Sequence, residues 1–217
     1  MNTTQMSRWT DQFGRDYTDR NSLTLPELDV LYHRNYGETR KELNERFLAE
    51  VPRSARILEV GCNIGNQLGM LQKVGFFNLY GIEIQHYALR QAKSRARGIN
   101  VVAASAFEIP FRSESFDLVF TSGLLIHIAP ADLSLVLSEI HRCTNKYIWG
   151  FEYYSSVPME VSYRGHRDLL WKMNYAQAFL DRFDDLQLLR SEQLSYLGNS
   201  NVDSMFLIRK TRTASAQ

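Results

Sequence analysis

The chain has 217 residues, 44% of them hydrophobic, and a formal net charge of +1 at pH 7. This length suits one α/β domain with additions, and the hydrophobic content is sufficient for a buried core. A nucleic-acid binder usually shows a basic excess or a basic stripe, and neither stands out here. We therefore expect no nucleic-acid partner.

The cysteines and the N-terminal residues bear on metal content and compartment. Cys62 and Cys143 belong to no CxxC pair, so the sequence predicts neither a zinc site nor a disulfide framework. The first nine residues lack the apolar segment of a signal peptide, and no apolar run approaches the roughly 18 residues of a membrane span. The expected protein is cytoplasmic, has reduced thiols, and has no metal and no membrane partner.

Residues 1–50 form an N-terminal extension. Within it, residues 8–50 are polar and aromatic, and their spacing predicts helices with a break near Pro26 and a further helix from Leu28 to Val51. Aromatic side chains recur every four residues, which places three of them on one helical face: Trp9, Phe13 and Tyr17. We expect this extension to form a helical lid.

From residue 56 short strands alternate with helices. Strands are expected at 57–60, 79–83, 100–103, 116–121 and 146–152, and helices at 66–74, 86–97, 131–143 and around 171–183. Two strand-like runs, 187–196 and 203–208, are joined by a short turn-rich segment and predict a hairpin. Residues 51–210 should form an α/β, Rossmann-like domain, and residues 211–217 a disordered tail. Its sheet should be mostly parallel and seven-stranded, with an antiparallel last strand and helices on both faces.

The first of these strands ends in the glycine loop Glu59-Val-Gly-Cys-Asn-Ile-Gly65. Ligands of open α/β sheets bind beyond the carboxyl ends of the strands. Gly61 and Gly65 allow a sharp turn and a close approach to a ligand, and Asn63 tolerates left-handed backbone angles. Glu83 ends the second strand, where a carboxylate can accept both hydroxyls of a ribose.

Three features favour S-adenosylmethionine over a dinucleotide as the ligand. The loop lacks the third glycine of G-x-G-x-x-G, whose helix N-terminus holds a pyrophosphate. Glu59 can reach the cationic end of S-adenosylmethionine, whereas a carboxylate there would repel a pyrophosphate. The C-terminal hairpin is characteristic of the class I methyltransferase sheet.

Segments after the third and fourth strands complete the predicted cofactor site. Ser105-Ala-Phe107 follows the third strand, where adenine is normally held, and backbone N–H groups with the Phe107 ring replace the usual acid. Thr121-Ser-Gly123 should pass beside the methionine part. The predicted cofactor-binding residues are Glu59, Gly61, Asn63, Gly65, Glu83, Ile84, Ala106, Phe107, Thr121 and Gly123.

Five segments together resemble one known family: Trp9-x3-Phe13-Gly14-x2-Tyr17-x2-Arg20-Asn21, Leu58-Glu-Val-Gly61, Leu125-Ile-His-Ile128, Glu152-Tyr-Tyr154 and Val161-x-Tyr163-Arg-Gly-His166. They look like the pseudaminic acid biosynthesis-associated methylases, which are class I S-adenosylmethionine-dependent methyltransferases often associated with bacterial nonulosonic sugar pathways. The resemblance runs from about Trp9 to Arg209. It implies a pathway association and fixes no acceptor.

Methyl transfer from a sulfonium is an in-line displacement, so the protein must align the acceptor, exclude water and sometimes remove a proton. The predicted catalytic residues follow the fourth and fifth strands: His127, Glu152 and Tyr154. Arg164 can grip a carboxylate or phosphate bidentately, which suits a sugar acid. The predicted acceptor-binding residues are Tyr17, Arg20, Asn21, Tyr153, Tyr163, Arg164 and His166.

Each assignment has a structural alternative. His127 can cap local backbone groups, the Tyr153–Tyr154 pair can be interfacial, and Phe107 can be a core aromatic. Arg164 can pair with a nearby acid on the surface. The N-terminal aromatic residues can simply pack on the sheet.

The sequence thus predicts a methyltransferase that moves a methyl group to an O or N atom of a small polar metabolite, with a nonulosonic or amino-sugar acid as the leading candidate. A small amine or carboxylate acceptor and a non-catalytic S-adenosylmethionine-binding protein are the alternatives. The loop and the hairpin disfavour an NAD-dependent oxidoreductase. The missing Asp/Asn-Pro-Pro-Tyr/Phe motif disfavours base methylation. We expect a monomer or a homodimer.

Overall fold

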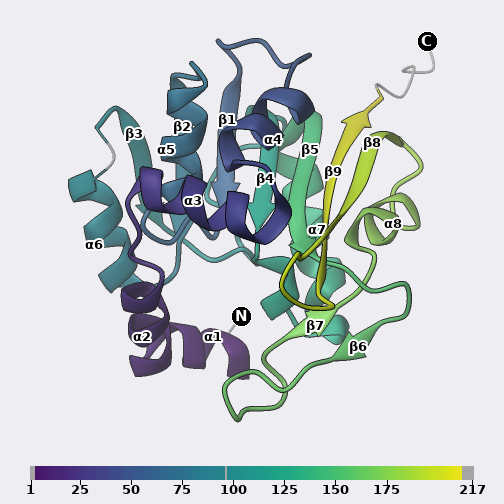
Figure 1. Ribbon diagram of the computed structural model, residues 1–217. Helices are drawn as coiled ribbons and strands as arrows, with labels where there is room; N and C mark the ends of the chain where they lie inside the picture. Colours follow the sequence, from purple (N-terminus) through teal and green to yellow (C-terminus); the bar gives the residue numbers. More distant parts are fainter. Residues whose placement is uncertain (1–2, 96, 212–217) are drawn as a thin grey trace.

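The computed structural model describes residues 3–95 and 97–211. Seven strands form one sheet in the order β3-β2-β1-β4-β5-β9-β8, and β9 alone runs antiparallel to its neighbours (Figure 1). The strands are β1 (Arg56–Val60), β2 (Asn78–Glu83), β3 (Ile99–Ala103), β4 (Phe116–Ser122), β5 (Thr144–Tyr153), β8 (Leu186–Ser195) and β9 (Val202–Lys210). The predicted Rossmann-like sheet and its terminal hairpin are confirmed.

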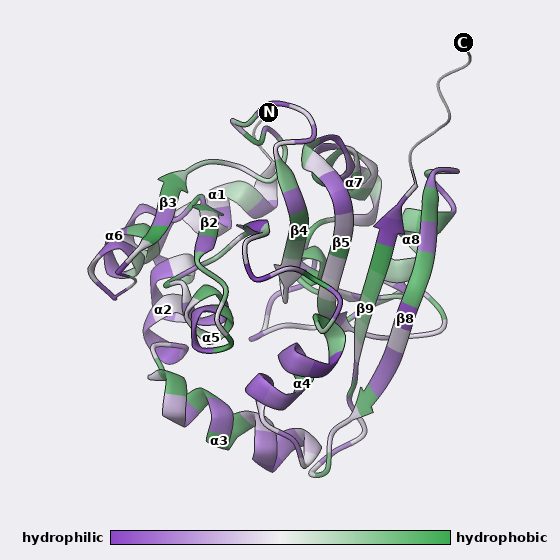
Figure 2. Ribbon diagram, turned by 90° about the horizontal axis from the view of Figure 1, so that it is seen from above, coloured by the Kyte–Doolittle hydropathy of each residue, from purple (hydrophilic) through white to green (hydrophobic). Residues whose placement is uncertain are grey.

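Helices cover both faces of the sheet. One face carries α3 (Leu25–Tyr36), α4 (Arg40–Phe47), α5 (Asn66–Lys73) and α6 (His86–Arg95); the other carries α7 (Pro130–Cys143) and α8 (Tyr175–Leu180). Because successive strand residues point to opposite faces, the neighbours Ile57 and Leu58 enter different hydrophobic clusters. In Figure 2, β9 is hydrophobic along its middle and α4 is mostly hydrophilic, as expected for a buried strand and an amphipathic helix.

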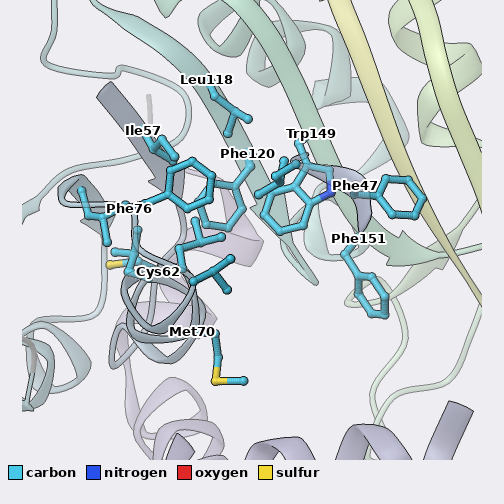
Figure 3. Packing of buried hydrophobic residues seen from close by; sticks show 14 of the residues in the cluster. Phe47, Ile57, Cys62, Met70, Phe76, Leu118, Phe120, Trp149 and Phe151 are labelled. Carbon is cyan, nitrogen blue, oxygen red and sulfur yellow. The ribbon is translucent and has the colours of Figure 1, made fainter. Parts of the chain in front are cut away.

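Aromatic side chains fill the core between α4, α5 and the sheet. Figure 3 shows Phe47, Phe120, Trp149 and Phe151 projecting into this layer, and the Phe120 and Trp149 ring centroids lie 4.9 Å apart. Each fully buried large apolar side chain stabilises the fold by roughly 1.5–3 kcal/mol. This packing fixes the strands whose carboxyl ends carry the site.

Two expectations about helices were wrong. The expected helix Leu28–Val51 is two helices, because Gly37 ends α3 with a left-handed φ of 79° and Thr39 starts α4 with a capping box. The expected helix 171–183 is shorter, since α8 begins only at Tyr175. The first two residues of the expected helix instead form β7 (Trp171–Lys172), which pairs with β6 (Met159–Glu160).

The N-terminal helices α1 (Thr4–Thr10) and α2 (Gln12–Arg20) are separated at Asp11. Trp9 therefore lies on a different helix from Phe13 and Tyr17, yet its ring centroid is 5.2 Å and 5.1 Å from theirs. The break brings the backbone so close that a Cβ on Gly14 would lie 1.9 Å from the Trp9 carbonyl oxygen.

Figure 1 shows α1 and α2 beyond the carboxyl ends of the parallel strands, beside the β6–β7 segment. Within the described ranges, no helix is both long and apolar enough to cross a bilayer. The expected tail lies outside the described residues except for Thr211.

Replacing Gly150 by Ala should lower the free energy of unfolding by roughly 1–3 kcal/mol, because the added Cβ would lie 2.1 Å from Cζ of Phe206. Urea unfolding followed by tryptophan fluorescence measures the change. Gly198→Ala is the matched control, since nothing lies within 4 Å of its Cβ, and it should shift stability by less than about 0.5 kcal/mol. Equal effects of the two substitutions would contradict this account of the packing.

Candidate active site

A cavity of about 380 Å³ opens at the carboxyl ends of the parallel strands, where α1–α2, the strand-following loops and the start of β9 meet. Four carboxylates belong to its lining: Glu59, Glu83, Glu152 and Asp203. Among the described residues that line it, none is Lys or Arg. Such a cavity favours cationic and hydrogen-bond-donating ligands.

The glycine loop after β1 closes against its neighbours through backbone contacts. Gly61, Asn63 and Gly65 have φ values of 75°, 47° and 80°, so the expected left-handed Asn63 is confirmed. The Gly61 N–H donates to the Ile82 carbonyl at 2.9 Å. A Cβ on Gly61 would lie 2.7 Å from Leu124, so only glycine fits without a shift.

Glu83 is held by the backbone at the end of β2. Its carboxylate accepts hydrogen bonds from the N–H groups of Asn63 (2.8 Å) and Gln85 (2.7 Å). Burial raises the pKa of Glu83, while hydrogen bonds from Gln85, Asn63 and Ile84 oppose that shift. Each carboxylate oxygen retains acceptor capacity, so the residue fits the hydroxyl groups of a ribose.

Glu59 carries an unsatisfied oxygen in the cavity lining. The residue is 2% exposed, and its Oε2 has no hydrogen-bond partner among the described residues. Burial raises its pKa well above the usual value, and the cation of Arg40 opposes that shift. Arg40 is itself fully buried; it donates to Asn44 and Tyr32, and packs 4.5 Å from the Phe151 ring centroid. The orphaned oxygen fits a cationic ligand group.

The segment after β3 lines the cavity with Ser105, Ala106 and Phe107, and Ile84 lies beside it. The Phe107 N–H donates to Ser105 Oγ at 3.1 Å, so this donor is already used within the turn. The half-buried Phe107 ring also packs on the apolar cluster beneath. The wall is therefore mainly apolar and suits a planar base.

His127 ends the short 3-10 helix Leu125–His127 after β4 and is buried below Trp9, with ring centroids 4.4 Å apart. Its Nδ1 lies 2.6 Å from the Leu169 carbonyl oxygen, which assigns the hydrogen to Nδ1 and leaves Nε2 as an acceptor. Burial lowers its pKa to about 4, so the ring is neutral at physiological pH.

Glu152 supports this short helix from the neighbouring strand. Its two oxygens accept the N–H groups of Leu124 (3.2 Å) and Ile126 (3.4 Å). Burial raises the pKa of Glu152 to about 7, and hydrogen bonds from Thr121 and the backbone oppose that shift. Glu152 thus positions the segment that carries His127.

The structure brings most of the other expected site residues into the lining. Tyr17, Asn21, Gly123, Tyr153 and Tyr163 lie there. Expected residues outside the lining are Arg20, Gly65, Thr121, Tyr154, Arg164 and His166. Arg164 is exposed at the tip of the turn that Tyr163 and His166 close, and its φ is 52°.

Sequence reasoning missed a polar cluster at the other end of the cavity. The hydroxyls of Tyr36 (2.5 Å) and Tyr196 (3.1 Å) donate to Oδ2 of Asp203. Burial raises the pKa of Asp203 to about 6. No motif marks this residue, and only the register that pairs it with Tyr153 across β5 and β9 places it at the site.

Gln85 was also missed. Its side-chain amide donates to the carbonyls of Trp9 (3.0 Å) and Asp11 (3.1 Å), which lie at the break between α1 and α2. Across the described chain, no group of three or more His, Cys, Asp or Glu side chains is arranged to hold a metal ion.

Comparison with known proteins bears on this geometry. Residues 58–147, which contain the glycine loop, Glu83 and His127, match a family model described as a methyltransferase domain. An O-methyltransferase from Aspergillus nomiae is 30% identical over 108 residues, which are 47% of this chain and 46% of that protein. An uncharacterized methyltransferase from Synechocystis sp. is 31% identical over 87 residues, 40% of this chain and 41% of that protein.

The matches support a class I methyltransferase that uses S-adenosylmethionine. The chain spans less than half the length of these curated relatives. The narrower resemblance to the pseudaminic acid biosynthesis-associated methylases stays a prediction.

Solved structures of a methyltransferase and of a cyclase share the fold. A 1,6-didemethyltoxoflavin-N1-methyltransferase from Burkholderia thailandensis, solved with S-adenosylhomocysteine, superposes with a TM-score of 0.66 at 16% identity, covering 93% of this chain and 90% of its own. The [4+2]-cyclase SpnF gives a TM-score of 0.67 at 14% identity, with coverage of 97% and 98%. At such identities the likeness shows the fold alone.

The raised pKa of Glu152 predicts a pH-dependent stability. Because the folded-state pKa of about 7 exceeds the ordinary carboxyl pKa of 4.5, the stabilising contribution of Glu152 is full below pH 4.5 and is lost as the pH rises through 7. Going from pH 8 to pH 5 should therefore stabilise the native chain more than the Glu152→Gln variant, by on the order of 2–3 kcal/mol. Urea unfolding at both pH values measures the difference.

The exposed Glu50 provides the control, since Glu50→Gln should keep the pH dependence of the native chain. If Glu152→Gln behaves in the same way as this control, the buried carboxyl does not titrate as described.

Proposed function

We propose that the chain transfers a methyl group from S-adenosylmethionine to an O or N atom of a small polar metabolite. The observation that carries the proposal is the pair of buried carboxylates beside the glycine loop. Glu83 offers acceptors for the ribose hydroxyls, and the unpartnered oxygen of Glu59 suits the cationic end of the cofactor.

The bound cofactor would supply a sulfonium-activated methyl group. The chain's own task is to hold an acceptor in line, exclude water and receive a proton. Trp9, whose ring centroid lies 4.4 Å from that of His127 at an interplanar angle of 54°, excludes water from one side. Nε2 of His127 is the atom that takes a proton from the acceptor, because the Leu169 carbonyl fixes the hydrogen on Nδ1. We propose further that residues 1–50 act as a lid on a catalytic domain of residues 51–210.

The acceptor class follows from the charge of the cavity lining. A nonulosonic or amino-sugar acid is the candidate that the family resemblance suggests, and a small amine is the alternative. The four lining carboxylates favour an acceptor that carries an amine or hydroxyls over one recognised through its carboxylate. Arg164, the expected carboxylate ligand, lies outside the lining.

Methyl transfer needs a test separate from cofactor binding, because one fold hosts different chemistries. The fold shared with a [4+2]-cyclase illustrates this point. The decisive experiment is a screen of amino sugars, sugar acids and small amines for S-adenosylmethionine-dependent mass gain of one methyl group. Cofactor binding without any methylated product would favour the non-catalytic alternative.

Substituting Glu83 by Ala should weaken S-adenosylmethionine binding at least tenfold, since each hydrogen bond to a charged group contributes about 1.5–3 kcal/mol. Isothermal titration calorimetry with S-adenosylmethionine and S-adenosylhomocysteine measures the affinities. Exposed Glu50→Ala is the matched control and should bind as the native chain does. An unchanged affinity in a folded Glu83→Ala variant would refute the ribose assignment.

With an acceptor from the screen in hand, His127→Gln should lower kcat by about 100-fold or more, as loss of a general base does. The affinity for S-adenosylhomocysteine should stay nearly unchanged, because Nε2 serves the acceptor. Full turnover by this variant would remove His127 from the chemistry.

A further inference from the structure

The cavity has a second end that the cofactor residues leave unused. Glu83 lies at the end of β2, whereas Asp203 lies near the start of β9, four strands away in the sheet. At about 4.8 Å per strand, these two positions are roughly 19 Å apart across the sheet. Tyr153 on β5 pairs directly with Asp203 in the β-sheet register. This end lies on the acceptor side if Glu83 holds the ribose.

Asp203 is a buried carboxylate with half of its acceptor capacity unused. The residue is 2% exposed, and Tyr36 and Tyr196 both donate to its Oδ2. Its Oδ1 has no hydrogen-bond partner among the residues described. The ammonium of Lys172 donates instead to Oδ1 of Asn201 at 2.6 Å. An unsatisfied buried carboxylate oxygen destabilises the fold, so its presence points to a ligand.

Aromatic rings surround this carboxylate. The ring centroids of Tyr36 and Tyr196 are 4.8 Å apart, and those of Tyr153 and Tyr196 are 6.5 Å apart. The Lys172 ammonium lies 5.1 Å from the Tyr153 centroid, so one of these rings already contacts a cation. Aromatic faces beside a carboxylate are the arrangement that recognises ammonium groups.

We propose that Asp203, with Tyr36, Tyr153 and Tyr196, anchors an ammonium group of the acceptor. The proposal rests on the methyltransferase function and narrows its substrate class. An anchored ammonium is protonated and has no free electron pair, so the methyl-accepting atom is a different heteroatom of the same molecule. The acceptor class is therefore a small amino compound with a second nucleophilic group, such as an amino sugar, an amino alcohol or a diamine.

The test compares three sugars of matched size: D-glucosamine (cationic), D-glucose (neutral) and D-glucuronate (anionic). Each is titrated into the full chain saturated with S-adenosylhomocysteine, and binding is followed by ligand-observed NMR. Glucosamine should bind at least about tenfold more tightly than glucose, which corresponds to about 1.4 kcal/mol, and glucuronate should bind most weakly.

Substitutions test whether Asp203 causes this preference for glucosamine. Asp203→Asn should abolish the preference for glucosamine while leaving the affinity for S-adenosylhomocysteine within about twofold. Exposed Asp181→Asn is the matched control and should retain the preference. If Asp203→Asn proves unstable in thermal unfolding, Tyr153→Leu replaces it and should weaken glucosamine more than glucose.

Three results overturn the proposal: no preference for glucosamine, tightest binding of glucuronate, or a preference that survives Asp203→Asn. Failure of the methyltransferase function has separate readouts: the native chain would either not bind S-adenosylhomocysteine or give no methylated product in the acceptor screen. In that case the same sugar titrations on the cofactor-free chain still test the anchor.

Discussion

The site depends on one physical constraint: its buried carboxylates have no basic partner and must be stabilised by other hydrogen-bond donors. Within the described residues, Glu59, Glu83, Glu152 and Asp203 form no ion pair within 4.0 Å. Desolvation of such groups costs several kcal/mol unless donors replace the lost water. Backbone N–H groups do this for Glu83 and Glu152, and two hydroxyls do it for Asp203. Loop shape, the position of His127 and the cavity's preference for cations all follow from this arrangement.

Local patterns were sufficient to predict most of the fold. Short apolar strands, the glycine loop and the terminal hairpin are short-range features, and the structure confirms the sheet that they predict. The errors lie where one residue overrides helical spacing, as Gly37 does, or where a two-residue strand such as β7 depends on a distant partner. Periodicity carries no information about either.

The candidate site also has a part that local sequence patterns predict and a part that depends on long-range strand pairing. Glu59, Gly61, Asn63 and Glu83 sit at fixed spacings around one loop, so their neighbourhood could be predicted. Asp203 reaches the cavity through strand pairing with a residue 50 positions earlier. The match to the methyltransferase domain model covers residues 58–147, which include His127 but neither Tyr153 nor Asp203. The proposed roles of Tyr153 and Asp203 therefore depend on this chain's own side chains and not on the family match.

Gln85 connects the N-terminal helices to the end of β2 through hydrogen bonds. The Gln85 N–H donates to Glu83, and its side-chain amide holds the Trp9 and Asp11 carbonyls. A single residue thus connects the Glu83 carboxylate, for which we propose the ribose role, with the helices that cover His127. This linkage has a kinetic consequence. A cofactor that holds Glu83 in place also restrains α1 and α2 through Gln85, so the cofactor should bind before the acceptor and dissociate after the product.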